Sequence, residues 1–219
     1  MRIAIIIPCY NEEKTIKAVV EAAQPYGTPI VVDDASSDES ARLAAEAGAE
    51  VVRHHANRGY DGALQSGFER ADEMGFQAIA TLDGDGQLDA AVLGRLLAPI
   101  REGRADLVLG RRPKAGRVSE AAFNGYTRLR FGVPDILCGQ KSYNMELFRE
   151  HGRIDSAGSI GTQLALWALR QNKRHEIVSV PVRPRVGKSR IGSSIRANNV
   201  IFRALFKAIA ADIRGGKWA

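Results

Sequence analysis

The first half of the chain alternates short apolar runs with segments whose apolar residues recur at helical spacing. The runs, which read as strands, cover residues 3–7, 30–32, 51–52, 78–82 and 107–109. Between them, one helical face is apolar around residues 16–23, 64–71 and 92–100. Because neighbouring parallel strands require a crossover connection, this alternation predicts an α/β fold with a mostly parallel central sheet flanked by helices. Such sheets bind ligands at the carboxyl ends of their strands.

The second half of the chain is less regular. The segment GRRPKAGRVSEAAFNGY (110–126) reads as a basic loop, and IVSVPV (177–182) reads as a strand. Between them, Leu164, Trp167 and Ala168 follow helical spacing. No repeat, low-complexity tract or linker is visible, so we expect a single domain over residues 1–219 that ends in a basic amphipathic helix at about 193–214.

Positive charge is concentrated at the end of the chain. Lys and Arg number 31 against 25 Asp and Glu, which gives a net charge of +6 and indicates an anionic partner. From Arg183 onward, Asp212 is the only acid. The apolar face of the last helix could rest on an anionic membrane surface, or pack on the protein's own core or on a sister subunit of a homodimer. No nucleic acid is expected, because the basic residues lack interleaved aromatics.

Cysteine usage and hydropathy indicate a cytoplasmic protein. Cys9 and Cys138 are the only cysteines, and their spacing suggests neither a disulfide framework nor a zinc site. The first apolar run is too short for a signal peptide, and no stretch approaches the roughly 20 apolar residues that cross a bilayer. Any membrane contact is therefore expected to be peripheral, on the cytoplasmic face.

The stretch TLDGDGQLD places Asp83, Asp85 and Gln87 directly after a predicted strand. Their oxygens suit Mg²⁺ or Mn²⁺, and a glycine-rich turn lets alternate side chains converge. Alternatively, the stretch is an acidic turn in which Asp89 caps the next helix. The sequence context, rather than the motif alone, favours the metal site.

Three other predicted strand ends are also polar. PCYNEE follows the first strand, VVDDASSDES spans the end of the second, and NRGYDGALQSGFERA follows the third. Asp33 or Asp34 could accept hydrogen bonds from a base or ribose, while the serines that follow could cap the next helix. Gly67, inside a predicted helix, indicates a close approach of backbone or ligand.

Together with LVLGRR and DILCGQK, these motifs resemble, in order and spacing, the inverting glycosyltransferases of family 2. The resemblance covers roughly residues 1–190 and implies the GT-A fold. Within that family the chain is most similar to the branch of dolichol-phosphate mannose synthase and related polyprenyl-phosphate glycosyltransferases, whose metal motif reads D-x-D-x-Q. This implies sugar transfer from a nucleotide-diphosphate sugar to a polyprenyl phosphate, with Mg²⁺ or Mn²⁺ as cofactor.

The resemblance also implies roles for individual residues. The donor nucleotide would be bound by Pro8, Tyr10, Asn11, Glu12, Asp34, Asn57 and Asp83. The metal would be held by Asp83, Asp85 and Gln87, and phosphate groups by Arg111, Arg185, Ser189 and Arg190. Catalytic roles would fall to Asp85, Arg111 and Asp135.

One feature departs from the family pattern. Members that act on sugar hydroxyls need a general base, often an acid near the start of the helix that here begins around SIGTQLALW. Residues 156–175 contain no acid, and Thr162 and Gln163 lie in its place, which leaves Asp135 as a candidate. Three readings stay open: a phosphate acceptor that needs no base, a saccharide hydroxyl acceptor, or a nucleotide-sugar-binding module with weak or no catalysis.

Overall fold

The computed structural model describes residues 1–86, 89–113, 117–154, 158, 160–181 and 194–214, and the side chains of 194–196 are not described. The strands are β1 (Ile3–Cys9), β2 (Thr28–Asp33), β3 (Glu50–Arg53), β4 (Ala78–Thr81), β5 (Leu107–Arg111), β6 (Lys141–Asn144) and β7 (His175–Ser179). The helices are α1 (Ile16–Ala23), α2 (Ser40–Glu46), α3 (Gly59–Glu73), α4 (Leu93–Arg101), α5 (Val118–Phe131), α6 (Met145–His151), α7 (Gln163–Arg170) and α8 (Ser194–Ile213), with the 3-10 turn η1 (Ala90–Val92).

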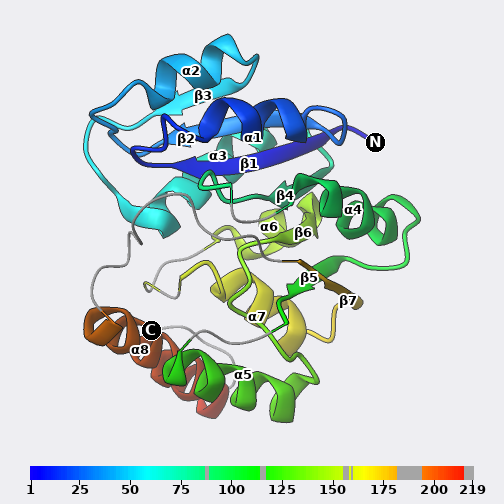
Figure 1. Cartoon of the computed structure of the whole chain (residues 1–219). Helices are drawn as coiled ribbons and strands as arrows, with labels where there is room; N and C mark the ends of the chain where they lie inside the picture. Colours follow the sequence, from blue (N-terminus) through cyan, green and yellow to red (C-terminus); the bar gives the residue numbers. More distant parts are fainter. Residues whose placement is uncertain (87–88, 114–116, 155–157, 159, 182–193, 215–219) are drawn as a thin grey trace.

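All seven strands form one sheet in the order β3-β2-β1-β4-β6-β5-β7 (Figure 1). β6 pairs antiparallel with β4 and with β5, and the other neighbours pair in parallel. The mostly parallel sheet predicted from the apolar runs is therefore confirmed. Because β4 and β5 both run against β6, their carboxyl ends lie on the same edge of the sheet as those of β1 and β2.

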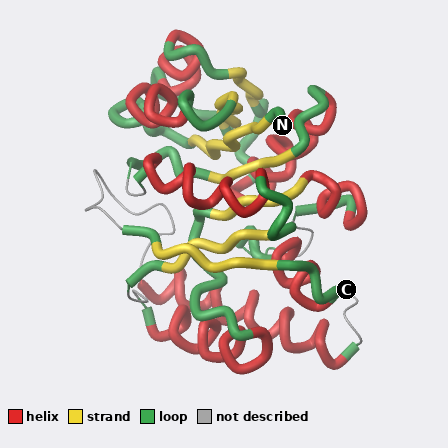
Figure 2. Tube along the Cα trace, turned by 90° about the vertical axis from the view of Figure 1, so that its right-hand side faces the viewer, coloured by secondary structure: helices red, strands yellow, loops and turns green. Residues whose placement is uncertain are grey.

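Helices cover both faces of the sheet, each over its own apolar core (Figure 2). α1, α2 and α4 bury their apolar residues on one face, while α3, α6, α7, α5 and α8 do so on the other. Gly67 of α3 lies against β1, where an added Cβ would meet Ile6 Cγ2 at 2.4 Å. The predicted close approach at Gly67 is thus between a helix and a strand.

The segment expected to be a basic loop, 110–126, is instead largely helical, since α5 begins at Val118. Its apolar periodicity is weak because several residues that it buries are polar. Ser119 donates to Asn198 of α8 at 2.5 Å, and Glu120 forms ion pairs with Arg112 and Arg117. A helix that packs through polar contacts carries no apolar stripe that could reveal it.

α8 lies where the sequence predicts the last helix, and much of its apolar side joins the core beside α5. Within the described part of the chain, no helix is both long and apolar enough to cross a bilayer.

Candidate active site

The segment after β4 carries the two aspartates at the carboxyl edge of the sheet. Thr15 Oγ1 donates to the carbonyl oxygen of Gly84 at 2.7 Å, and Gly86 adopts a positive φ of 71°. The chain therefore turns sharply between Asp83, which is partly buried, and Asp85, which is 8% exposed. Asp89 caps η1 by accepting from Ala91 N at 3.0 Å, as the sequence suggested for a cap.

The Asp83 carboxylate is held in place from two sides. Tyr60 of α3 donates to Asp83 Oδ1 at 3.2 Å. Gly139, just before β6, lies against the opposite side, where a Cβ would sit 2.3 Å from Asp83 Oδ2. Only a glycine at position 139 leaves room for this carboxylate.

Burial and the neighbouring charge of Asp85 raise the pKa of Asp83 to about 6. The hydrogen bond from Tyr60 and the positive charges of Lys141 and Arg112 oppose this rise. A buried carboxylate that a neighbouring negative charge disfavours in its ionised form suits a divalent cation, which would relieve the repulsion. Among the described residues no group of three or more His, Cys, Asp or Glu side chains could hold a metal, so water and donor phosphates would complete the coordination. Gln87, the third predicted ligand, lies outside the described residues.

The predicted nucleotide-binding residues lie on the loops after β1 and β2. Asn11, with a positive φ of 53°, accepts from Ser37 N at 2.8 Å, and its own N–H donates to Ser36 Oγ at 2.9 Å. Glu12 N donates to Ser40 Oγ at 2.8 Å. Pro8 lies within β1, and Tyr10, which follows β1, is 40% exposed. These contacts join the two loops into one wall at the sheet edge.

Asp33 and Asp34 at the end of β2 differ in their contacts. Asp34 accepts from the backbone N–H groups of Arg58 and Gly59 at 2.7 and 2.8 Å and contacts His54 Nδ1 at 2.7 Å. Asn57 Nδ2 donates to the Asp34 carbonyl at 3.2 Å. Asp33 is fully buried and forms an ion pair with Arg53 at 3.2 Å. Asp34 therefore fixes the start of α3, and its nucleotide-binding role stays a prediction.

Asp135 lies in a two-pronged ion pair. Arg112 Nε donates to Asp135 Oδ2 at 2.8 Å, Arg112 Nη2 donates to Oδ1 at 2.9 Å, and Arg112 N adds a third bond at 3.0 Å. Burial acts to raise the pKa of Asp135, but the bonds and charge of Arg112 outweigh it and lower the pKa below its ordinary value. A carboxylate held ionised in this way is a poor proton acceptor. The predicted catalytic role of Asp135 is untested, and its contacts favour positioning of Arg112.

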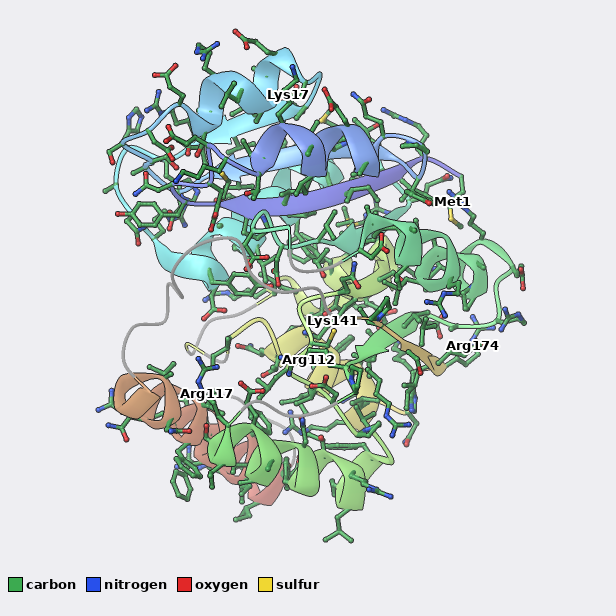
Figure 3. The ribbon with its side chains drawn as sticks, in the orientation of Figure 1. Met1, Lys17, Arg112, Arg117, Lys141 and Arg174 are labelled. Atoms are coloured by element: carbon green, nitrogen blue, oxygen red, sulfur yellow. The ribbon has the colours of Figure 1, made fainter. Side chains whose placement is uncertain are left out.

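Sequence reasoning gave no role to Lys141 of β6. Its side chain lies next to Arg112 in the middle of the molecule (Figure 3), and the residue is 5% exposed. Burial lowers the pKa of Lys141, while the charges of Asp135 and Asp83 act to raise it. The strand that carries Lys141, KSYN, has no apolar run that would reveal it. The one sequence signal for Lys141 is that it follows the Cys138-Gly139 pair.

The two arginines after β5 face different surroundings. The positive charge of Arg112 acts on Asp83 and opposes the rise in its pKa. Arg111, predicted to be catalytic and to bind phosphate, is exposed and lines a pocket with Arg95, Arg112, Pro113 and Ser179. The structure thus brings Arg112 and Lys141 toward Asp83. The other predicted phosphate ligands, Arg185, Ser189 and Arg190, lie outside the described residues.

A carboxylate from another element reaches the start of α7, where the sequence lacks an acid. Asp61 of α3 accepts from Gly161 N at 2.6 Å and from Ile160 N at 3.3 Å. Ile160 and Gly161 both have positive φ angles, 58° and 63°, which turn their N–H groups toward this side chain. Thr162 itself is fully buried, and among the described residues Asp61 brings a carboxylate to this position.

The chain resembles known proteins over most of its length. The model of the family described as "Glycosyl transferase family 2" matches residues 4–158. An uncharacterized glycosyltransferase of Mycobacterium tuberculosis is 30% identical, over 95% of this chain and 98% of that protein. Polyprenol monophosphomannose synthase of Mycolicibacterium smegmatis is 29% identical, over 98% of this chain and 88% of that protein.

A solved structure gives the same fold. Glucosyl-3-phosphoglycerate synthase from Mycobacterium tuberculosis, in complex with Mg²⁺ and uridine diphosphate, matches with a TM-score of 0.73 and 19% identity. The match covers 98% of this chain and 79% of that one. The expected GT-A fold is therefore confirmed.

Proposed function

The chain belongs to glycosyltransferase family 2, and from this premise we propose that it is a metal-dependent inverting enzyme that transfers one sugar from a nucleotide-diphosphate sugar to a polyprenyl phosphate. The name of its relative, polyprenol monophosphomannose synthase, supports the acceptor class. The donor nucleotide would lie against the loops after β1 and β2, with Asp34 and Asn57 beside it.

One observation carries the proposal: positive charge faces the aspartates while the nearby acids are engaged. Arg112 and Lys141 both act on Asp83, and Asp135 holds Arg112 through two bonds. A phosphate monoester is largely ionised at neutral pH, so it needs no general base and is attracted by these cations. A neutral saccharide hydroxyl would gain nothing from them.

Asp83 and Asp85 suit a divalent cation, because the negative charge of Asp85 helps to raise the pKa of the buried Asp83 carboxyl. Mg²⁺ or Mn²⁺ bound there would neutralise charge on the departing diphosphate. Arg112 would share this task, because its guanidinium is fixed by Asp135 before substrate arrives. The acceptor phosphate would attack the sugar from the face opposite the diphosphate, with Lys141 balancing its charge.

Donor and metal binding can be tested by thermal shift with nucleotide-diphosphate sugars, with and without Mg²⁺ or Mn²⁺. A donor that binds the native state raises the melting temperature. Asp85→Ala should keep its fold, lose the metal-dependent part of the shift and lose sugar transfer. Normal sugar transfer by Asp85→Ala in metal-free buffer would show that the reaction needs no metal at this site.

A saccharide acceptor is a second candidate because of Asp61, which lies where a general base would be needed. Its carboxylate already accepts hydrogen bonds from the backbone N–H groups of Ile160 and Gly161, just before α7. Asp61→Asn keeps an oxygen for Gly161 N but removes the base. With a phosphate acceptor the variant should transfer at close to the wild-type rate, whereas loss of a general base costs about 10² to 10⁴ in kcat. A loss of that size, with label in water-soluble oligosaccharide, would favour the hydroxyl acceptor.

A further inference from the structure

α5 and α8 lie side by side at the end of the molecule beyond β5 and β7, as both views show (Figures 1 and 2). Ser119 pairs with Asn198 near their beginnings, and Tyr126 donates to Asp212 at 2.6 Å near their ends. The helices are therefore parallel. Both turn their buried residues into the same core, so their opposite sides form one outer face.

This outer face carries exposed apolar side chains. Of the nine large hydrophobic residues that are exposed in the described part of the chain, five lie on these two helices. Leu129 is 92% exposed, Ile213 82%, Val118 77% and Phe206 66%. Such a concentration on one layer is unusual for a surface that meets only water.

The exposed charges of the same two helices, among their described side chains, are all positive. Arg128 and Arg203 are exposed, as are Arg130, Lys207 and, just beyond α8, Arg214. The two acids point inward: Glu120 pairs with Arg112 and Arg117, and Asp212 with Arg130 and Arg170. The outer face thus combines apolar side chains with exposed positive charge.

We propose that this outer face docks on a membrane surface that contains anionic lipid. We define the α5–α8 face by apolar Val118, Leu129, Phe206 and Ile213 and basic Arg128 and Arg203. Apolar side chains would enter the acyl boundary while the basic ones meet lipid phosphates. A second copy of the chain fits less well, because a symmetric contact would set arginine against arginine.

The inference rests on the proposed function, since a lipid-borne acceptor must reach the site from a membrane. A chain of ion pairs leads from the start of α5 inward. Arg117 binds Glu120 at 3.0 Å, Glu120 meets Arg112 at 3.4 Å, and Arg112 binds Asp135 at 2.8 Å. Arg117 and Arg112 lie in this order between the α5–α8 layer and the sheet (Figure 3). A polyprenol in the bilayer could therefore present its phosphate along a path lined by these two arginines.

Co-sedimentation with vesicles tests the docking directly. We expect the wild-type protein to bind vesicles of phosphatidylcholine with phosphatidylglycerol, to bind phosphatidylcholine alone weakly, and to be released by salt. Arg128→Gln/Arg203→Gln should weaken the partitioning about five-fold for each charge removed. Leu129→Gln/Phe206→Gln should weaken it about ten-fold or more. Because all four side chains are exposed, folding should be unaffected, which circular dichroism verifies.

The matched control is Lys17→Gln/Arg42→Gln, which removes two exposed charges from α1 and α2 at the opposite end of the molecule. It should bind vesicles like the wild type. An equal loss in this control, or no binding of anionic vesicles at low salt, would overturn the inference. So would a wild-type dimer that Leu129→Gln/Phe206→Gln converts to a monomer, because the face would then be a subunit interface.

A second readout separates this inference from the proposed function. With a water-soluble short-chain isoprenyl phosphate, both face variants should match the wild-type kcat/KM. With a polyprenyl phosphate embedded in anionic vesicles, they should lose transfer in proportion to lost binding. If the protein transferred sugar to the soluble acceptor but did not bind vesicles, the membrane role of the α5–α8 face would be wrong and the proposed function would stand. If the protein bound vesicles but transferred sugar to no phosphate acceptor, the proposed function would be wrong and the membrane role of the α5–α8 face would stand.

Discussion

Replacing Asp83 with asparagine should stabilise the metal-free protein while ending its activity. In the folded chain, burial and Asp85 hold the pKa of Asp83 at about 6, against 3.8 for the free side chain. Between these values the folded state binds the proton more tightly than the unfolded state does. The free energy of unfolding therefore falls as pH rises from 3.8 to about 6. Above about pH 6 the full destabilisation by the Asp83 charge is present.

The size of this cost follows from the shift in pKa. The rise from 3.8 to about 6 corresponds to about 3 kcal/mol of lost stability at neutral pH, at roughly 1.4 kcal/mol for each pKa unit. For a domain of this length, that predicts a rise in melting temperature of about 6–12 °C when the charge is removed. The bond from Tyr60 should survive, because asparagine keeps an oxygen acceptor.

The assay is calorimetry or thermal shift in buffer with chelator across a range of pH. The gain of Asp83→Asn over wild type should be full at pH 7.5 and shrink toward zero near about pH 4. Asp106→Asn is the control, and it should change stability in the opposite direction. The hydrogen bond from Arg174 lowers the pKa of Asp106, so removing this carboxylate should destabilise the protein slightly. An Asp83→Asn protein that is no more stable than wild type at pH 7.5 would show that the charge on Asp83 does not destabilise the fold.

The remaining predictions concern what holds the site together. Gly139→Ala would place a Cβ 2.3 Å from Asp83 Oδ2, so we expect loss of metal-dependent transfer and of the metal-induced thermal shift. A Cβ added at Gly125 of α5 would meet no atom within 4 Å. Gly125→Ala should therefore leave activity intact and raise the free energy of unfolding by about 0.5–1 kcal/mol. Asp135→Asn should lower the free energy of unfolding in urea by about 3 kcal/mol, because the partly buried Arg112 loses its two-pronged ion pair and keeps only the longer one with Glu120 at 3.4 Å.

Two results would contradict these expectations. If Gly139→Ala kept full transfer, the carboxylate would not depend on that close contact. If Asp135→Asn cost less than about 1 kcal/mol, the pair with Arg112 would behave like a surface ion pair and could not fix the guanidinium.

The fold of the first half could be predicted because its strands are buried on both faces. Parallel strands such as β1 and β4 read as continuous apolar runs, which neither loops nor exposed helices imitate. α5 could not be predicted in the same way, since Ser119 and Glu120 bury polar groups that are satisfied by α8 and by Arg112. Those partners are distant in the sequence.

In the candidate site, too, some residues could be placed from the sequence and others could not. Asp83 and Asp85 could be placed because strand ends at one sheet edge converge whatever the details of packing. Lys141 could not be placed, because β6 is a short antiparallel strand inserted between β4 and β5. Asp61 reaches α7 only through the tertiary fold, 100 residues away from Gly161.

Identifying the bond made in the product tests the proposed sugar transfer to a polyprenyl phosphate most directly. Purified protein would be incubated with Mg²⁺, a polyprenyl phosphate and the nucleotide-diphosphate sugar that gives the largest thermal shift, and the lipid fraction analysed by mass spectrometry. We expect a polyprenol joined to one sugar through a single phosphate, and we expect this product to be absent with Asp85→Ala. Sugar found only in water-soluble oligosaccharide, or no lipid product from a donor that binds, would contradict it.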